Sequence, residues 1–296
     1  MSCPACGGPL AAWRAGLERC TRCGTAVTTG APPPGDPRGY GTDRPRLAGV
    51  AAPLLAIFDR ARLRLLARVA PPPGRLVDAG AGRGRFVAAA QAAGYDATGI
   101  EPSPGAVEAA RTLYGVELSP AGVNAATFED LDAVSLWHVL EHLDDPAAAL
   151  ERIAGWLRPG GGLLLGVPNF ASIQARIGGK RWFHLDVQRH RVHFTPAGLR
   201  ALLERSGFEV VAERHVLLEH NVFGMWQTLV NRVAPTPNWL FRALQRDAPV
   251  RITDALVTLL ALPLVPVAAL LELACGLVRR GGTIAVVARA ATAPPR

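Results

Sequence analysis

The chain has 296 residues, 49% of them hydrophobic and 19% charged, and a formal net charge of +8. Its length suits one large domain or two smaller ones and excludes a peptide too short to bury a substantial core. The positive charge fits a nucleic acid, an anionic membrane face or an acidic substrate as a partner, but the arginines are scattered, so charge alone does not choose among them.

Four of the five cysteines form two C-x-x-C pairs near the start of the chain, Cys3 with Cys6 and Cys20 with Cys23. Two such pairs so close together are typical of a tetrahedral structural Zn²⁺ site. Disulfides would need an oxidising compartment, and no signal peptide precedes the first pair, so we expect a cytoplasmic protein. Residues 1–30 are therefore predicted to form a zinc-ribbon-like segment that folds around the metal. The alternative is a redox-active or free set of thiols.

A proline-rich linker, residues 31–45, separates this segment from the next. Residues 46–70 then read as an amphipathic helix, with Arg60, Arg62, Arg64 and Arg68 on much of its polar face. The helix is expected to end at the prolines that follow residue 70.

The stretch from Arg75 to Phe86 predicts a strand, a tight glycine turn and a helix. An apolar run, Leu76-Val77, reaches Asp78, and Gly80, Gly82 and Gly84 follow at alternate positions. Glycine permits a positive φ and lets a ligand approach the backbone without a Cβ in the way. A plain strand-to-helix connection is the alternative interpretation.

The spacing D-x-G-x-G-x-G differs from the dinucleotide fingerprint G-x-G-x-x-G. Together with Glu101 at the end of the next apolar run, it resembles the class I S-adenosylmethionine (SAM) methyltransferases. The resemblance implies that Asp78 holds the methionine end of SAM, that Glu101 accepts both ribose hydroxyls, and that an acidic pair meets the adenine. The cofactor residues implied are Asp78, Gly80, Ala81, Gly82, Gly84, Glu101, Pro102, Glu129, Asp130, Trp137 and His138.

Further motifs in the same order strengthen the resemblance, which covers residues 75 to about 215. They are the run from Leu136 to His142, Asp145-Pro146, the glycine segment 158–162 that is expected to end a helix, and Thr195-Pro196. The implied fold is α/β, a doubly wound, Rossmann-like sheet of seven strands whose last strand is antiparallel. The expected strands are 75–79, 96–101, 115–118, 133–137, 163–167, 208–211 and 283–287. The methyltransferase domain would then comprise residues 46–218 and 281–291.

Histidines near the expected ligand edge are candidates for a general base, because imidazole titrates near neutral pH. His190 and His193 lie on a loop after the fifth strand, and His142 follows the fourth. Some methyltransferases of this class bind a divalent metal through Glu-x-x-Glu-His, but His138 replaces the first Glu here. Surface or bracing histidines are the alternative.

Residues 219–280 form an insertion before the last strand, and residues 255–271 are apolar apart from Thr258. As a helix this run would be about 26 Å long, short of the ~30 Å hydrocarbon core, and Pro263 and Pro266 interrupt it. Arginines flank both ends, and the last strand must return to the same sheet. We expect a helical hairpin that touches a membrane without spanning it, with Phe223, Trp226, Trp239 and Phe241 at the headgroup level. A hairpin buried against the domain or in a homodimer is the alternative.

The function that these patterns favour is a SAM-dependent methyltransferase with a small-molecule, glycan or lipid-linked acceptor, at the inner face of a membrane. A zinc-ribbon RNA methyltransferase is a second hypothesis, but the apolar insertion disfavours a nucleic-acid partner. A nonenzymatic membrane adaptor is a third, against which the intact Asp78 and Glu101 argue.

Overall fold

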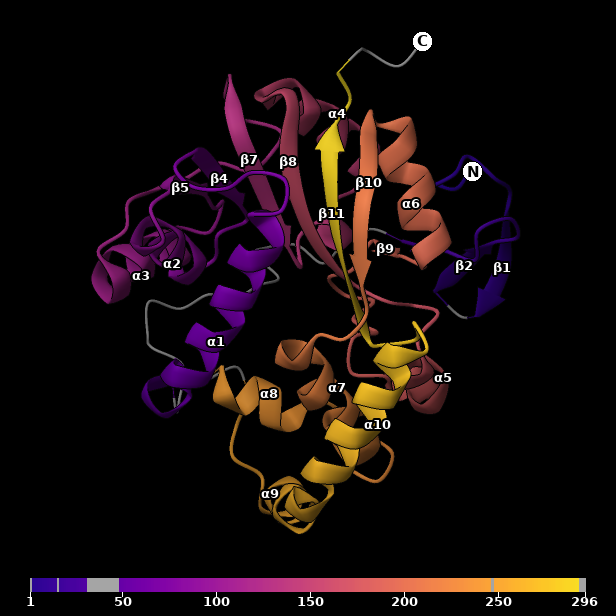
Figure 1. The fold of residues 1–296 in the computed structure, drawn as a ribbon. Helices are drawn as coiled ribbons and strands as arrows, with labels where there is room; N and C mark the ends of the chain where they lie inside the picture. The colour runs from indigo at the N-terminus through magenta and orange to yellow at the C-terminus, as the bar shows by residue number, and fades with distance from the viewer. Residues whose placement is uncertain (1, 15, 31–47, 246–247, 293–296) are drawn as a thin grey trace.

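The structure, a computed structural model, describes residues 2–14, 16–30, 48–245 and 248–292. Its centre is a seven-stranded sheet in the order β10-β11-β8-β7-β4-β5-β6 (Figure 1). The strands are β4 (Arg75–Ala79), β5 (Asp96–Ile100), β6 (Leu118–Ser119), β7 (Leu131–Trp137), β8 (Leu157–Pro168), β10 (Phe208–Arg214) and β11 (Thr283–Ala290). Strand β11 is antiparallel to both of its neighbours. The predicted α/β fold with an antiparallel strand between the fifth and sixth strands is confirmed.

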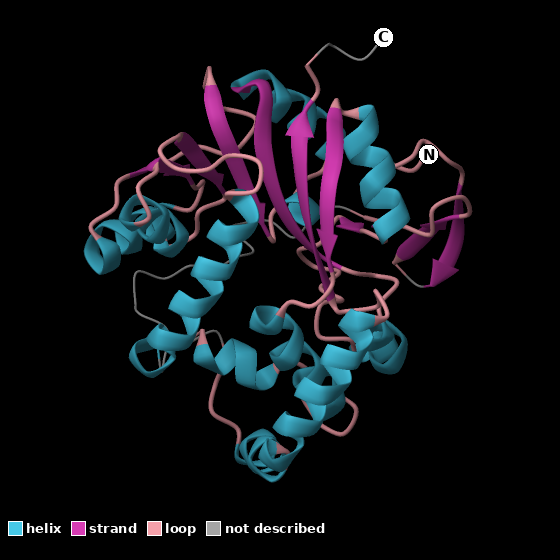
Figure 2. Ribbon diagram, in the orientation of Figure 1, coloured by secondary structure: helices cyan, strands magenta, loops and turns pink. Residues whose placement is uncertain are grey.

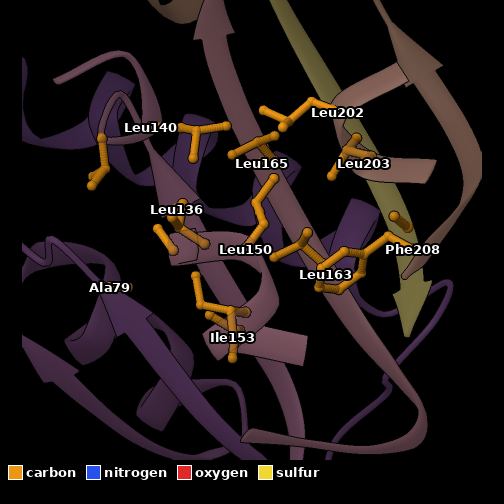
Figure 3. Close-up of a cluster of buried hydrophobic side chains, with 14 of the residues drawn as sticks. Ala79, Leu136, Leu140, Leu150, Ile153, Leu163, Leu165, Leu202, Leu203 and Phe208 are labelled. Atoms are coloured by element: carbon orange, nitrogen blue, oxygen red, sulfur yellow. The ribbon is translucent and has the colours of Figure 1, made fainter. Parts of the chain in front are cut away.

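Helices cover both faces of this sheet (Figure 2). They are α1 (Ala48–Leu66), α2 (Arg85–Ala92), α3 (Pro104–Tyr114), α4 (Pro146–Trp156) and α6 (Pro196–Arg205). Successive strand residues face opposite sides, so Leu163 and Leu165 pack with α4 and α6 in one core, whereas Leu164 packs with α1 and α2 in another. Figure 3 shows the first core, where Leu150 and Ile153 of α4 lie against β7 and β8.

Local sequence explains where the helices begin. Asp145 caps α4 by accepting a hydrogen bond from Ala148 N at 3.0 Å, and Pro146 follows at the first helical position. Such a side-chain cap satisfies an N–H that the helix itself leaves unpaired. Thr195 caps α6 in the same way.

The N-terminal segment forms a second, four-stranded sheet in the order β1-β2-β3-β9. Its strands are β1 (Leu10–Arg14), β2 (Leu17–Cys20), β3 (Ala26–Thr28) and β9 (Val192–His193). The fourth strand comes from the long loop after β8, which also contains α5 (Ile173–Gly178) and the short 3₁₀ turn η2 (Gly179–Arg181). Another 3₁₀ turn, η1 (Leu140–His142), follows β7. The N-terminal segment is therefore attached by backbone pairing to the loop that carries the histidine candidates. The sequence had not indicated this attachment.

The insertion contains four α-helices, α7 (Leu218–Asn231), α8 (Trp239–Leu244), α9 (Ile252–Leu260) and α10 (Val265–Leu277), with η3 (Leu262–Leu264) between the last two. They gather at the lower end of the sheet in Figure 1, where β10 ends and β11 begins. Among the described residues no single helix is long and apolar enough to cross a membrane. The pair α9 and η3–α10 reaches that length and composition only together, and it is bent by 41°.

Several expectations need correction. Trp226 and Trp239 do not lie at an outer surface. They are buried within the insertion, and their indole N–H groups donate to Ala261 O and Pro249 O. Arg62, expected on a solvent face, is only 7% exposed.

Two element boundaries also differ. Strand β8 begins at Leu157 rather than at 163. Leu157 pairs with Leu131 and Gly162 with Ala133, and the register shifts between these two pairs, so the glycine segment is an irregular part of the strand. The helix expected over 46–70 is seen as α1, Ala48–Leu66. The predicted linker, residues 31–45, lies outside the described residues.

Candidate functional site

The turn after β4 lies at the carboxyl edge of the sheet and has no room for side chains. Gly80 has φ +77°, and a Cβ there would lie 2.4 Å from Val139 Cγ2. The N–H groups of Gly80 and Ala81 both donate to Ile100 O, at 2.9 and 3.0 Å. Gly84, which opens α2, also has a positive φ of +77°. The turn is thus fixed against the end of β5 with its backbone exposed to a ligand.

Two buried carboxyl groups flank this turn. Asp78 Oδ1 accepts a hydrogen bond from Ser135 Oγ at 2.5 Å, and burial raises its pKa to about 6 in spite of that bond. Glu101 accepts from the backbone N–H of Gly82 at 2.9 Å and of Ser103 at 3.0 Å. A carboxylate accepts hydrogen bonds on both oxygens, which is the chemistry that a vicinal diol requires. Asp78 is suited to a cationic partner, which would offset its burial.

The other acidic residues predicted for this site lie elsewhere. Glu129 and Asp130 precede β7, and Glu129 O accepts a hydrogen bond from Arg75 at the amino end of β4. In parallel strands that end of the sheet is opposite to the end that carries Asp78 and Glu101. The structure does not bring this pair to the glycine turn. Pro102 follows Glu101 and is exposed.

Trp137 ends β7, and its indole ring contacts Gly166 and Arg62. A Cβ on Gly166 of β8 would come within 2.7 Å of the indole, so the ring lies flat over the glycine backbone. The guanidinium of Arg62 lies 4.0 Å from the ring centroid. A cation over an indole face is favourable, and the contact joins α1 to the end of β7.

His138, directly after β7, lies at the centre of a group of polar rings. It adopts a left-handed φ of +56°, and its N–H donates to Gly166 O. Its Nδ1 lies 3.0 Å from Glu141 Oε1, and its ring stacks on His184 at 5.9 Å and meets the edge of His220 at 4.6 Å. His138 Nε2 is buried without a hydrogen-bond partner among the described residues. A buried ring nitrogen in this state is suited to the hydroxyl of a ligand.

His184 and His220 are site residues that the sequence analysis missed. His184 follows η2, is 7% exposed, and has a pKa lowered well below its usual range, first by burial and then by His138. It is therefore neutral at physiological pH. His220 comes from α7 in the insertion, and its side chain is 38% exposed. In the sequence His184 lies between Phe183 and Leu185, and His220 between Glu219 and Asn221, so neither belongs to a motif that marks a site.

A network of buried charges fixes α7 to the helices around the glycine turn. Arg62 of α1 forms a bidentate pair with Glu219, with Nε–Oε2 at 2.9 Å and Nη2–Oε1 at 2.5 Å. Arg85 at the start of α2 binds the same Glu219 at 3.2 Å and also Asp59 of α1. Bidentate pairs of this kind fix geometry as well as supplying energy. The start of the insertion is thus part of the wall of the site.

The three predicted catalytic histidines lie together under the N-terminal sheet. His193 Nε2 is 3.0 Å from Thr28 Oγ1, and that hydroxyl donates to His190 O at 2.7 Å. His142 Nδ1 donates to Arg189 O at 3.2 Å, and its ring meets His190 at 4.7 Å. Burial lowers the pKa of His193 to about 4 and that of His190 well below its usual range. The loop that carries His190 and His193 also contacts the site, because Arg191 N donates a hydrogen bond to Glu141 O.

The four N-terminal cysteines converge on one point. All are free thiols, with Cys3 Sγ 3.7 Å from Cys23 Sγ and Cys6 Sγ 3.5 Å from Cys20 Sγ. A tetrahedral ion with bonds of about 2.3 Å would place its thiolates about 3.8 Å apart. Burial raises the pKa of the Cys3 and Cys23 thiols, whereas for Cys20 the N–H groups of Cys23 and Arg22 outweigh burial and lower the pKa to about 6. A bound cation would favour the thiolate form of all four. Spacing and chemistry therefore fit a structural Zn²⁺ ion.

Comparisons with known proteins agree with this geometry. A family model described as a methyltransferase domain matches residues 52–213. A ubiquinone biosynthesis O-methyltransferase of Xanthomonas campestris pv. campestris (strain B100) is 37% identical over 112 residues, which are 35% of this chain and 46% of that protein. The chain thus spans about half the length of the curated relatives it matches.

Solved structures share the fold. The [4+2]-cyclase SpnF superposes with a TM-score of 0.52 at 18% identity, covering 86% of this chain and 97% of that one. A SAM-dependent methyltransferase from Archaeoglobus fulgidus gives a TM-score of 0.50 at 17% identity, covering 79% and 94%. At such identities the likeness shows the fold alone, and a cyclase among these structures means that the reaction must be argued from the site. The matched segment covers more than half of the chain, from α1 through β10, and the chain belongs to the methyltransferase-domain family.

Proposed function

We propose that the protein transfers the methyl group of SAM to a hydroxyl oxygen of a small-molecule acceptor. The observation that carries the proposal is His138 Nε2, buried without a partner at the carboxyl edge of the sheet while Glu141 holds the other ring nitrogen. The name of the Xanthomonas relative, an O-methyltransferase, supports an oxygen acceptor. Lipid-linked and glycan acceptors fall within the same chemistry, because both offer hydroxyl groups.

Two carboxyl groups at this edge of the sheet fit SAM. The buried Asp78 can pair with its ammonium, and Glu101 can accept from its ribose diol across the glycine turn. The bound sulfonium supplies an already activated methyl group, so the protein mainly has to orient the acceptor and exclude water. His184 and the half-exposed His220 lie beside His138 and form the acceptor side of the site.

His138 is the proposed general base. Glu141 accepts a hydrogen bond from the Nδ1–H group of His138. The Nε2 atom then carries the lone pair, which can take the proton of the acceptor hydroxyl. As the acceptor oxygen forms its bond to the methyl carbon, the carbon–sulfur bond breaks, the hydroxyl proton moves to Nε2, and S-adenosylhomocysteine leaves. His190, His193 and His142 remain candidates for the same task, but burial makes the first two weak bases.

The acceptor-side test replaces His138 with Gln. Loss of a general base typically costs 10²–10⁴-fold in rate, so we expect kcat to fall by at least about 100-fold while SAM affinity changes little. Release of S-adenosylhomocysteine is measured by mass spectrometry over a panel of phenols, glycans and extracted lipids. His193→Gln is the matched control, and a greater loss in that variant would move the base to the loop histidines.

The cofactor-side test follows from Asp78. Only its carboxylate form pairs with an ammonium, and its pKa in the free protein is about 6. SAM affinity should therefore be constant above pH 7 and weaken below pH 6 by up to about tenfold per unit. Asp78→Asn should abolish this pH dependence and weaken binding about 10- to 150-fold, as for a lost hydrogen bond to a charged group. Calorimetry measures both effects.

Asp130→Asn is the control for that test, because Asp130 lies before β7, at the amino end of the strand. Its affinity for SAM should equal that of the wild-type protein. If Asp78→Asn and Glu101→Ala both bind SAM as well as the wild type does, the site is assigned to the wrong residues.

We also propose that the four cysteines hold one structural Zn²⁺ ion. Elemental analysis should find about one zinc per chain, and Cys20→Ser should lose most of it. The metal-free variant should also show faster amide exchange at Val192 and His193, since β9 pairs with β3. Cys275→Ser, a buried cysteine of α10, is the control and should keep its zinc. Full zinc content in Cys20→Ser would refute the site.

A further inference from the structure

The helix pair α9–α10 exposes apolar side chains and buries its acidic ones, the reverse of a helix pair on a water-soluble surface. Its exposed side carries large apolar side chains at helical spacing, with Ile252 at 76%, Leu260 at 78%, Leu270 at 69% and Leu277 at 70% exposure. Exposed leucines and valines also continue through the bend at η3. A continuous apolar surface of this kind marks an interaction site.

The acidic residues of the same segment point inward. Within residues 252–278, all of which the structure describes, the charged residues are Asp254 and Glu272, and both are at most 2% exposed. Asp254 accepts from Thr236 N at 3.0 Å. Glu272 accepts from Gln174 Nε2 and from Gly282 N, each at 2.7 Å. The buried acids are held by hydrogen bonds, and the outer surface of the pair carries no charge of its own.

Positive charge borders this uncharged surface on both sides. Arg251 directly precedes α9, Arg279 and Arg280 follow α10, and all three are exposed. Arg279 also pairs with Glu213 at 3.3 Å, whereas no ion pair of Arg251 or Arg280 is seen among the described residues. An apolar surface bordered by arginines matches anionic headgroups above acyl chains. The 41° bend and the return of the chain into β11 favour a pair lying in the interface rather than crossing it.

We propose that the exposed side of α9–α10 docks on an anionic lipid bilayer. The docked helices are connected to the acceptor side of the site, because Gln174 Nε2 bonds both Glu272 of α10 and the carbonyl of Asn221, the residue after His220. This connection assigns the acceptor to compounds held in or at the bilayer, and that assignment rests on the proposed methyl transfer. The docking itself does not depend on that activity.

The test is flotation of the full chain with vesicles of phosphatidylcholine, with and without phosphatidylglycerol. The wild-type protein should float with the anionic vesicles, and Leu260→Asp/Leu270→Asp should stay in solution while binding SAM normally. Arg251→Gln should lower the partition coefficient on anionic vesicles by roughly fivefold, the effect of one basic residue near a charged membrane. Tyr114→Asp/Val211→Asp adds the same charge at exposed sites on α3 and β10, and it should float like the wild type.

Failure of the wild-type protein to float overturns the proposal. If the protein is then a monodisperse dimer that Leu260→Asp/Leu270→Asp dissociates, the surface is an interface between two copies. Equal flotation with neutral vesicles overturns the assigned preference for anionic lipid. A protein that floats but does not bind SAM leaves the docking surface in place and refutes the proposed activity, so the two failures are distinguishable.

Discussion

The direction of β11 determines at which edge of the sheet the insertion before it must lie. Strand β11 is antiparallel between β8 and β10, so it begins at the edge where the parallel strands end. Everything between β10 and β11 must therefore leave and re-enter the sheet at its carboxyl edge, which is also the ligand edge of an open α/β sheet. A long insertion at this point has to border the site. That is why α7 can contribute His220 to the ring cluster around His138.

Buried charge then fixes the insertion in place. Breaking a buried ion pair leaves an uncompensated charge, which costs far more than breaking a surface pair. Arg62, Arg85, Asp59 and Glu219 pair with one another across α1, α2 and α7, so the three helices have one favourable relative position. Glu272 is held by hydrogen bonds instead of an ion pair, and its bond from Gly282 N attaches α10 to the start of β11. The apolar side of α9–α10 is consequently held at a fixed place beside the site.

Local sequence patterns predicted the features that depend only on residues adjacent in the sequence. The strand over residues 75–79, the glycine turn and the caps of α4 and α6 follow from a few adjacent positions each, and the antiparallel last strand followed from the family resemblance. Contacts between distant residues were not predictable. Arg62 was expected in solvent because helical periodicity separates polar from apolar faces but does not reveal Glu219, 157 residues away. Glu129 and Asp130 were expected at the site from the family resemblance, although they precede a strand and so lie at the other edge.

The central claim is that the carboxyl edge is one site, with SAM on the Asp78 and Glu101 side and the acceptor on the His138 side. A crystal structure with S-adenosylhomocysteine tests it most directly. The ribose diol should meet Glu101, the amino group should meet Asp78, and the sulfur should lie on the side of His138 and His220. A ligand bound at another edge of the sheet, or one whose sulfur is separated from His138 by intervening protein, would contradict the account.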